Sequence, residues 1–366
     1  MVRRVVRVEP SDPRWDAFVL AAPDATVFHH SGWIAALEHE NGQRPLMLAC
    51  EEPDGSFSAV LPLMKTRGLP LGLGGAEAAA RLSSLPRTPV AGPLGSHEGV
   101  VAVVQAAMDH ARASRHRLQL KPATPTLDGL VSGLAGNPWR VSYVKCLPPD
   151  PDDLRFGNSR NHARIGWAIR KAEREGLRVR DALDEADLRA WYRLYLDVNR
   201  RRGLPSRPYR LFQQAWERLR PAGFLRLLLV HQRRSGADHL LAGSMLLMLG
   251  QTTFYAFNGV VTEALPLRAN DLLQWHAMRE AAAAGYRWYD FGEVAEGRDG
   301  LAGFKSKWDT DARRLVRYNA PPLPDHEPRY GVLESSNRVQ QVALRAWQHV
   351  PLSATAYLGD RLHRFL

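Results

Sequence analysis

Three apolar segments joined by short turns, followed by one helix and one more strand, restrict the possible folds of this chain more than any other feature. The predicted strands of this group are residues 224–230, 240–249 and 252–258. The turns between them contain Gly236 and Gly250, and short Gly-containing turns between apolar runs are typical of hairpins. A helix over 270–284 and a strand over 287–291 follow. This order predicts an α+β domain in which helices cover a mixed, mostly antiparallel sheet.

The rest of the chain repeats this mixture of helices and strands. Three helices precede the hairpins, over residues 157–175, 186–201 and 208–220. In the first third, strands over 46–50 and 57–64 flank an Asp54-Gly55 turn, and a loop rich in Gly, Pro and Ala extends from 68 to 95. The other elements predicted there are helices over 33–40 and 100–114 and a strand over 117–120. This first part looks like a degenerate copy of the second, although the sequence itself shows no clear repeat.

The length of the chain sets the expected number of domains. With 366 residues it exceeds the usual size of one domain. We predict an N-terminal domain over 1–150, a second domain over 151–320, and a linker with basic amphipathic helices over 321–366. The two helices of this last segment, 335–349 and 352–366, either dock on the core or lie on a membrane.

The charge balance favours anionic partners. Lys and Arg number 49 against 38 Asp and Glu, so the net charge is +11, which suits phosphates, nucleic acid or acidic lipid headgroups. A proteome rich in Arg would give the same charge without any such partner, and both interpretations stay open. The two cysteines, Cys50 and Cys146, are too few for a disulfide framework, and the histidines lack metal-ligand spacing, so no metal is expected.

Nothing in the chain predicts passage through a membrane. The N-terminal residues lack the long apolar core of a signal peptide, and no uncharged apolar run reaches the roughly 20 residues that a membrane span needs. We therefore expect a cytoplasmic protein, with a peripheral contact at the inner face of the membrane as an alternative.

A strand that ends on acids, followed by a helix that carries lysines, marks the strongest candidate for a reaction centre. Asp290 and Glu293 end the strand, and either could accept a proton during a reaction. Asp290 could equally cap the strand end. On the helix over 301–308, Lys305 and Lys307 flank an apolar stripe on opposite sides, and at least one of them is expected to be solvated. The helical wheel does not say which lysine faces a site.

The helix over 157–175 has two contrasting faces. Ile165, Ala168, Ile169 and Ala172 share the side that should face the core. The opposite side carries a Trp among cations, namely Arg160, Arg164, Trp167, Lys171 and Arg174. Cations around an aromatic ring suit a phosphate or a nucleobase, while an ordinary solvated face is the alternative.

A third candidate lies where the helix over 270–284 begins. Free backbone N–H groups at such a start favour a phosphate, and Arg268 would add a cation beside Asn270. Asn270 or Asp271 could instead be a plain N-cap. The chain has no phosphate loop of the P-loop or dinucleotide type and no nucleophile elbow. These features favour a transferase that holds two substrates together for direct attack.

The motifs together resemble the FemABX-like branch of the GNAT superfamily, including its BioF2-like members. The resemblance is carried by the pattern that begins Asn161-x-x-Arg164-Ile165, by Trp191-Tyr192-Arg193, by Leu241-Ala242-Gly243, by Asp290-Phe291-Gly292 and by Gly303-Phe304-Lys305. It is good over about residues 150–310 and looser over 10–145.

This resemblance implies tandem GNAT-like domains, of which the second holds an acyl donor. Family members transfer an aminoacyl group from aminoacyl-tRNA, or an acyl group from coenzyme A, to an amine. Either donor would be a co-substrate, and no permanently bound cofactor is expected. The acceptor would be an amine on a glycan, a peptide or a lipid-linked molecule.

The family pattern also implies residue roles. It matches Lys305 to the lysine that stabilises the reacting carbonyl, with Phe304 beside it, and Arg164 to a basic position near acceptor phosphate. The donor's acyl group would lie between the strands over 252–258 and 287–291, next to Tyr255 and Asn258. Its phosphates would lie near Arg268 and Asn270.

Two departures from the cell-wall members place a peptidoglycan acceptor in doubt. Ala35, Ala36 and Leu37 stand where those members carry a lysine after the first-domain Trp, and no coiled-coil arm is present. The alternatives are therefore an acyl-CoA N-acetyltransferase that acts on a glycan- or lipid-linked amine, and a catalytically silent GNAT-fold binding module.

Overall fold

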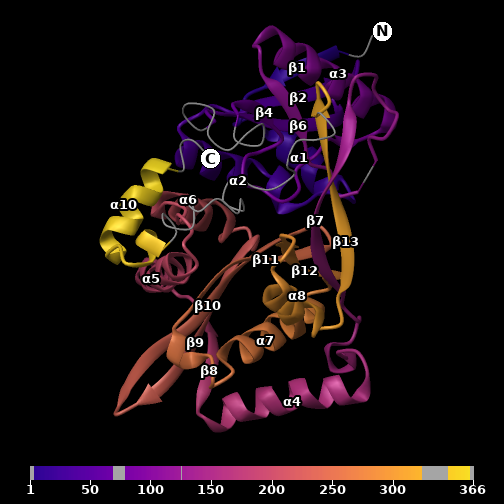
Figure 1. The fold of residues 1–366 in the computed structure, drawn as a ribbon. Coiled ribbons are helices and arrows are strands. Elements are labelled where there is room, and N and C mark those ends of the chain that lie inside the picture. Colours follow the sequence, from indigo (N-terminus) through magenta and orange to yellow (C-terminus); the bar gives the residue numbers. More distant parts are fainter. Residues whose placement is uncertain (1–3, 69–78, 125, 324–344, 363–366) are drawn as a thin grey trace. The chain divides into compact units, whose positions relative to one another are not determined.

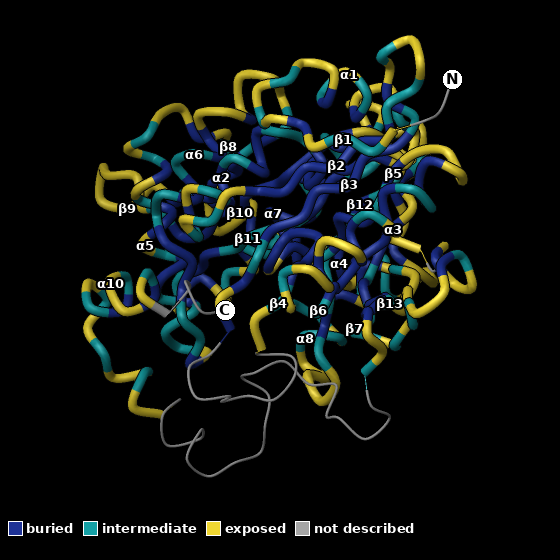
Figure 2. Tube along the Cα trace, turned by 90° about the horizontal axis from the view of Figure 1, so that it is seen from above, coloured by how far each residue is buried: buried dark blue, intermediate teal, exposed yellow. Residues whose placement is uncertain are grey.

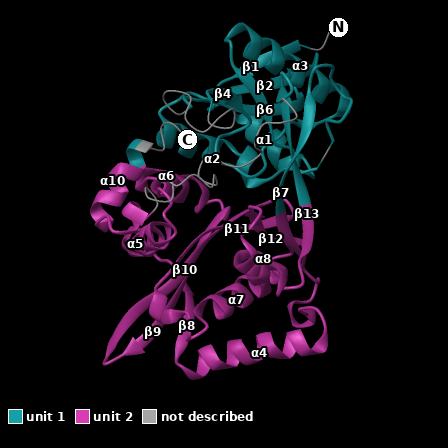
Figure 3. Ribbon diagram, viewed as in Figure 1, with its two compact units in different colours: residues 1–141, 314–340, 360–366 teal, residues 142–313, 341–359 magenta. Residues whose placement is uncertain are grey.

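The computed structural model describes residues 4–68, 79–124, 126–323 and 345–362 (Figure 1). The chain divides into two compact units, which Figure 3 distinguishes by colour. Unit 1 consists of residues 1–141, 314–340 and 360–366, and unit 2 consists of residues 142–313 and 341–359. Two strands, β7 (Ala135–Cys146) and β13 (Asp311–Ala320), belong partly to each unit.

Unit 1 is a twisted sheet with three helices. Its elements are β1 (Arg4–Val8), α1 (Pro13–Ala21), α2 (Ser31–Asn41), β2 (Leu46–Glu51), β3 (Phe57–Thr66), β4 (Arg81–Ser83), β5 (Leu94–Gly95), α3 (His97–Ala113) and β6 (Arg117–Leu120). Strands β1, β2, β3 and β4 pair antiparallel in that order, and β4 then pairs parallel with β6 across the α3 connection. The predicted hairpin around Asp54-Gly55 is confirmed as β2–β3.

Unit 2 combines strands and helices in a similar manner. Its elements are α4 (Ser159–Arg174), β8 (Leu177–Asp181), α5 (Glu185–Arg201), α6 (Tyr209–Leu219), β9 (Leu225–Arg234), β10 (Ala237–Leu249), β11 (Thr252–Val260), α7 (Ala269–Ala283), β12 (Trp288–Val294), α8 (Asp299–Ser306) and α10 (Leu352–Leu362), the end of which lies in unit 1. Strands β8 to β11 pair antiparallel in order, and β11 pairs parallel with β12 across α7.

The two units share one order of elements. Each contains a strand, two helices, three further antiparallel strands, a helix, and a strand that pairs parallel with the third of those strands. Unit 1 adds the short strand β5 before α3, and unit 2 adds the helix α4 before its first strand. The predicted α+β class with tandem domains is thus confirmed, because the degenerate copy that the sequence conceals is visible in the strand pairing.

Close packing of α5 on the unit 2 sheet depends on two glycines. A Cβ on Gly243 would lie 2.7 Å from Cδ1 of Trp191, and a Cβ on Gly259 would lie 2.7 Å from Cβ of Leu194. Trp191 is fully buried, and its Nε1 donates to the carbonyl of Gly243 at 3.0 Å. Strands such as β2 and β10 are buried for most of their length (Figure 2).

Several elements escaped the sequence prediction, and two of them have a clear physical reason. The strand β13 reads Asp-Ala-Arg-Arg-Leu at its start, where charges hide the apolar alternation, and β7 contains a proline and half-buried residues. β1, β8 and α1 were also not predicted. The loop prediction for 68–95 is wrong where β4 and β5 form, and residues 69–78 lie outside the described part.

The C-terminal helix α10 packs on unit 2. Thr355 is fully buried, and a Cβ on Gly359 would lie 2.6 Å from the carbonyl oxygen of Ser206. Of the predicted helix over 335–349, residues 335–344 lie outside the described residues. Across the part of the chain that the structure describes, every helix is too short or too polar to span a bilayer.

Candidate active site

The strands β11 and β12 separate and leave an opening in the unit 2 sheet. They pair parallel at only three positions, from Thr252↔Trp288 to Phe254↔Asp290, while β11 continues to Val260 and β12 to Val294. The rings of Tyr255 and Phe291 meet edge to face, with centroids 6.0 Å apart, just beyond the last pair. Burial raises the pKa of Tyr255. The family resemblance implies that the acyl group of the donor would bind at this opening.

Asp290 lies at the point where the two strands separate. Its Oδ1 accepts one hydrogen bond from Ser142 Oγ on β7 and one from the backbone N–H of Gly292, both at 2.7 Å. The second bond accompanies a turn of the backbone at Gly292, whose φ is +80°. Since β12 continues to Val294, Asp290 lies inside the strand and does not cap its end. Burial raises the pKa of Asp290, although both hydrogen bonds favour the charged form. A carboxylate with a raised pKa is a better proton acceptor.

Lys305 anchors α8 to this turn. Its side chain is buried, and its Nζ donates to the carbonyls of Gly292 and Glu293 at 2.9 and 3.2 Å. Burial lowers the pKa of Lys305 to about 8, because it outweighs the nearby carboxylates of Asp290 and Glu293. An ammonium group has three N–H donors, so two carbonyls leave one for a further acceptor.

Lys307 is partly buried, with 18% of its side chain exposed. Its ammonium forms an ion pair with Asp271 in the first turn of α7 and lies 4.4 Å from the ring centroid of Phe304. Burial is the main cause that lowers its pKa. Of the two lysines, Lys307 is the one that keeps contact with solvent, and it is held by its ion pair with Asp271. The two lysine side chains leave α8 in opposite directions and therefore have different partners. Lys305 binds the backbone of β12 at Gly292 and Glu293, and Lys307 binds Asp271 on α7.

The start of α7 and one face of α4 form a single basic cluster. Cζ of Arg268 lies 5.6 Å from the ring centroid of Trp167, and Nζ of Lys171 lies 5.8 Å from it. The sequence treats the basic face of α4 and the start of α7 as two separate candidates, whereas the structure brings Trp167, Lys171 and Arg268 together. Arg268 has a φ of +65°, a costly conformation for a residue with a side chain. It is the N-cap residue of α7 and makes no side-chain capping bond.

The other predicted residues lie on α7, α4 and β11. The N-cap interpretation of Asn270 and Asp271 is wrong, because the helix begins one residue earlier at Ala269. Asn270 Oδ1 is buried without a hydrogen-bond partner. Arg164 donates to Asn161 Oδ1 at 2.9 Å, and Asn161 Nδ2 reaches the carbonyl of Lys307 at 2.6 Å.

On α4, the buried and exposed faces follow the prediction, with Arg160 exposed one turn before Arg164. On β11, Asn258 Oδ1 accepts from the buried Ser244 Oγ at 2.9 Å. Asn258 is therefore fixed on the part of β11 that has left β12.

Comparison with known proteins identifies one matching family model and several similar structures. Residues 159–306 match the family described as an acetyltransferase (GNAT) domain. The structure is similar to the crystal structure of FemX, with a TM-score of 0.69, 16% identity, and coverage of 87% of this chain and 97% of that chain. The fold is FemX-like, and unit 2 carries a GNAT domain. The predictions of family, fold class and enzyme type are confirmed at this level.

Two further solved structures share the FemX-like fold. One is the C-terminal domain of a putative lysylphosphatidylglycerol synthetase from Agrobacterium fabrum, with a TM-score of 0.56, 13% identity, and 85% of this chain and 91% of that chain covered. The other is L-PGS from Bacillus licheniformis, with a TM-score of 0.57, 11% identity, and 94% and 97% covered. No curated protein matches the chain. The fold and the GNAT domain together support an N-acyltransferase.

Sequence reasoning missed two residues of unit 2 that form side-chain contacts near the candidate site. Ser142 donates to Asp290, and Lys145 forms an ion pair with Asp309 at 2.7 Å just after α8. Both residues belong to β7, which the sequence did not predict, and they lie more than 140 positions before their partners. Only the pairing of β7 beside β12 reveals them.

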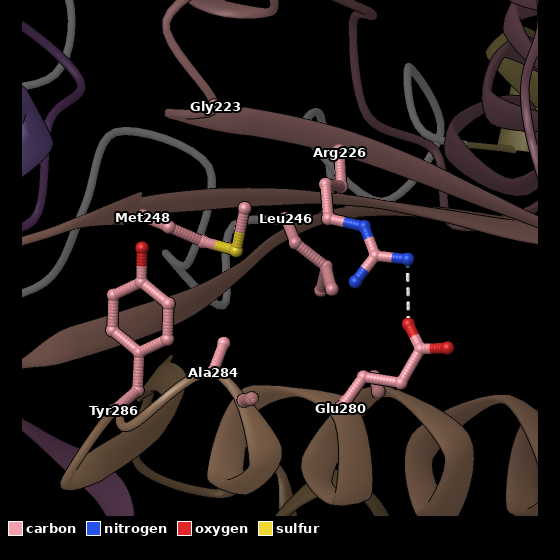
Figure 4. A pocket seen from close by; sticks show the side chains of 9 residues that line it. Gly223, Arg226, Leu246, Met248, Glu280, Ala284 and Tyr286 are labelled. Carbon is pink, nitrogen blue, oxygen red and sulfur yellow. Dashed lines mark ion pairs between the residues drawn. The ribbon is translucent and has the colours of Figure 1, made fainter.

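A cavity of about 170 Å³ lies at the other end of α7 in the GNAT domain (Figure 4). Its lining is Gly223, Arg226, Leu246, Met248, Ala277, Glu280, Ala281, Ala284 and Tyr286. Arg226 pairs with Glu280 at 2.5 Å and with Asp181 at 2.7 Å, so its charge is satisfied locally. None of the predicted site residues lines this cavity.

Proposed function

We propose that this protein transfers an activated acyl or aminoacyl group to an amine by direct attack, as a Fem-type transferase. The observation that carries the proposal is the opening between β11 and β12, with Asp290 and Lys305 at the point of separation. A strand opening in a sheet offers backbone N–H groups that the sheet does not use, and these can hold an extended donor chain.

The donor's acyl carbon would lie beside Tyr255 and Phe291, and its phosphate would contact Arg268 and the first N–H groups of α7. That helix has 15 residues and no side-chain cap. The N–H of Asp271 donates to the carbonyl of Arg268 at 3.0 Å, so the N–H groups of Ala269 and Asn270 are the ones that an anion would use. The exposed Arg268 guanidinium at the same end adds a charge that suits a phosphate.

In the reaction, the neutral amine nitrogen attacks the donor carbonyl carbon and forms the C–N bond. Asp290 accepts the proton that the nitrogen loses, and its raised pKa suits this role. The remaining N–H of Lys305 stabilises the negative charge on the carbonyl oxygen, an effect of roughly 3–4 kcal/mol for one well-placed donor. The C–O bond of an ester, or the C–S bond of a thioester, then breaks, and the leaving oxygen or sulfur takes up a proton.

The donor is either an aminoacyl-tRNA or an acyl-CoA. The net charge of +11 favours the polyanionic tRNA. The uncapped start of α7 with Arg268 favours the compact pyrophosphate of coenzyme A, and an N-acetyltransferase acting on a glycan- or lipid-linked amine is the second candidate.

Titration of the full chain with acetyl-CoA and with a non-hydrolysable aminoacyl-tRNA mimic, at low and at physiological salt, tests the proposal. Binding of coenzyme A that tolerates salt and weakens at least tenfold in Arg268→Ala would establish the acyl-CoA enzyme. Binding of the tRNA mimic alone, weakened by salt, would establish the aminoacyl transferase. If neither donor binds, the protein is a GNAT-fold binding module, and the proposed function is wrong.

A further inference from the structure

The outward face of α4, here called the α4 basic face, is rich in cations. It consists of Arg160, Arg164, Trp167, Lys171 and Arg174. The helix as a whole carries five Lys or Arg and a single acid, Glu173. Its other side is buried against the core, so the helix cannot turn these cations elsewhere. This face therefore presents a fixed positive surface.

Exposed apolar groups accompany these cations. Trp167 is 45% exposed and is one of six large hydrophobic residues of the described chain that are largely exposed to solvent. Leu265, which is 46% exposed, is another of the six, and it belongs to the turn that ends in Arg268. Arg268 in turn contacts Trp167. An exposed Trp and Leu among cations make this surface both basic and apolar.

The arrangement around Trp167 does not favour base stacking. Nucleic-acid platforms offer the open face of an aromatic ring to a base. Here Lys171 and Arg268 both lie over the Trp167 ring, at 5.8 and 5.6 Å from its centroid, and compete with a base for its faces. A half-exposed indole flanked by long cationic side chains is instead typical of residues at a membrane surface. There the ring enters the headgroup layer and the cations remain in water.

We propose that the α4 basic face binds the surface of an anionic lipid bilayer. Each cation near such a surface strengthens binding about fivefold, and a single buried Trp adds the apolar contact that keeps the helix at the interface. The inference rests on the charge and exposure of α4 and stands whether or not the proposed function is correct. If both hold, the acceptor amine belongs to a molecule held in or on the membrane.

Co-sedimentation of the full chain with vesicles tests this inference. We expect binding to phosphatidylcholine vesicles that contain about one third phosphatidylglycerol, little binding to pure phosphatidylcholine, and release by high salt. The double variant Arg160→Glu with Arg174→Glu should bind at least tenfold more weakly. Both arginines are exposed, so the folded state should tolerate the change. Trp167→Ala should weaken binding severalfold and make the remainder more sensitive to salt.

Matched control variants distinguish a specific role of the α4 basic face from an effect of the protein's overall charge. Arg193→Glu with Arg233→Glu changes the charge of exposed residues elsewhere in unit 2 by the same amount, and Leu183→Ala removes a hydrophobic side chain that is 70% exposed. Both controls should bind vesicles like the unmodified protein. Equal losses in the controls, or no binding to phosphatidylglycerol vesicles at low salt, would overturn the inference. Binding of tRNA but not of vesicles, lost in the Arg160/Arg174 variant, would assign the face to RNA instead.

Discussion

At the scale of one residue, Lys305 shows how burial changes the protonation of a side chain. The sequence marked this lysine by its place after Gly303-Phe304, and the structure explains why it differs from an ordinary surface lysine. It is 5% exposed, and its Nζ is held by two backbone carbonyls at the turn where Asp290 lies. The same contacts that restrain the ammonium also lower its pKa to about 8. Its charge is therefore costly to the folded state at neutral pH.

This cost predicts a pH dependence of stability. The unfolded chain has a Lys pKa near 10.5 and the folded chain about 8, so between these values the unfolded state binds more protons and stability rises with pH. We expect the unmodified protein to gain up to about 3 kcal/mol of unfolding free energy over Lys305→Met between pH 8 and 10.5. Urea unfolding across this range would measure it. A difference between the two proteins that does not change with pH would contradict the assigned pKa.

A second prediction at this scale concerns turnover. Once a donor and acceptor are known, Lys305→Met should lower kcat by roughly 10²–10³-fold, because it removes one donor to the oxyanion while keeping a side chain of similar length. Circular dichroism and the unfolding midpoint provide the check on folding. Retained turnover in a folded variant would leave Lys305 with the structural role alone.

At the scale of elements, the packing of α5 on β11 decides how the opening in the sheet is held. Gly259 lies near the end of β11, on the part that has left β12. Atoms of Leu194 and Tyr195 on α5 occupy the place of its missing Cβ, at 2.7 and 2.8 Å. The backbone amide of Tyr195 cannot move without the helix, so any side chain at position 259 must push α5 and β11 apart.

We therefore predict that Gly259→Ala destabilises the fold by about 1–3 kcal/mol through overpacking. It should also weaken donor binding, since β11 forms one side of the opening. Gly300→Ala is the matched control, because a Cβ there would meet no atom within 4 Å. The midpoints of thermal unfolding compare the two variants. Equal midpoints would show that α5 can shift to accommodate the added Cβ at no cost in stability, and would contradict the prediction.

At the scale of the whole molecule, the sequence predicted where helices and strands lie along the chain better than which of them contact one another in space. Alternation and glycine turns located β9, β10 and β11 to within a few residues, and the helical wheel of α4 identified its buried side. Ser142 could not be found in this way, because its role depends on β7 lying beside β12. The common cluster of Arg268 and Trp167 was equally hidden, since it depends on packing between α4 and α7.

The return of β13 to unit 1 has a consequence for dissecting the chain. Residues 318–320 pair with β6, and Tyr318 is fully buried, with its hydroxyl donating to Asp128 at 2.7 Å. A fragment that ends at residue 141 would leave β6 with an unpaired backbone edge and an empty place in its core. Such edges recruit strands from other molecules. If that fragment is insoluble, the cause would be the missing strand partner of β6 and not an intrinsic instability of unit 1. Joining residues 314–320 to the fragment through a linker should restore the pairing of β6.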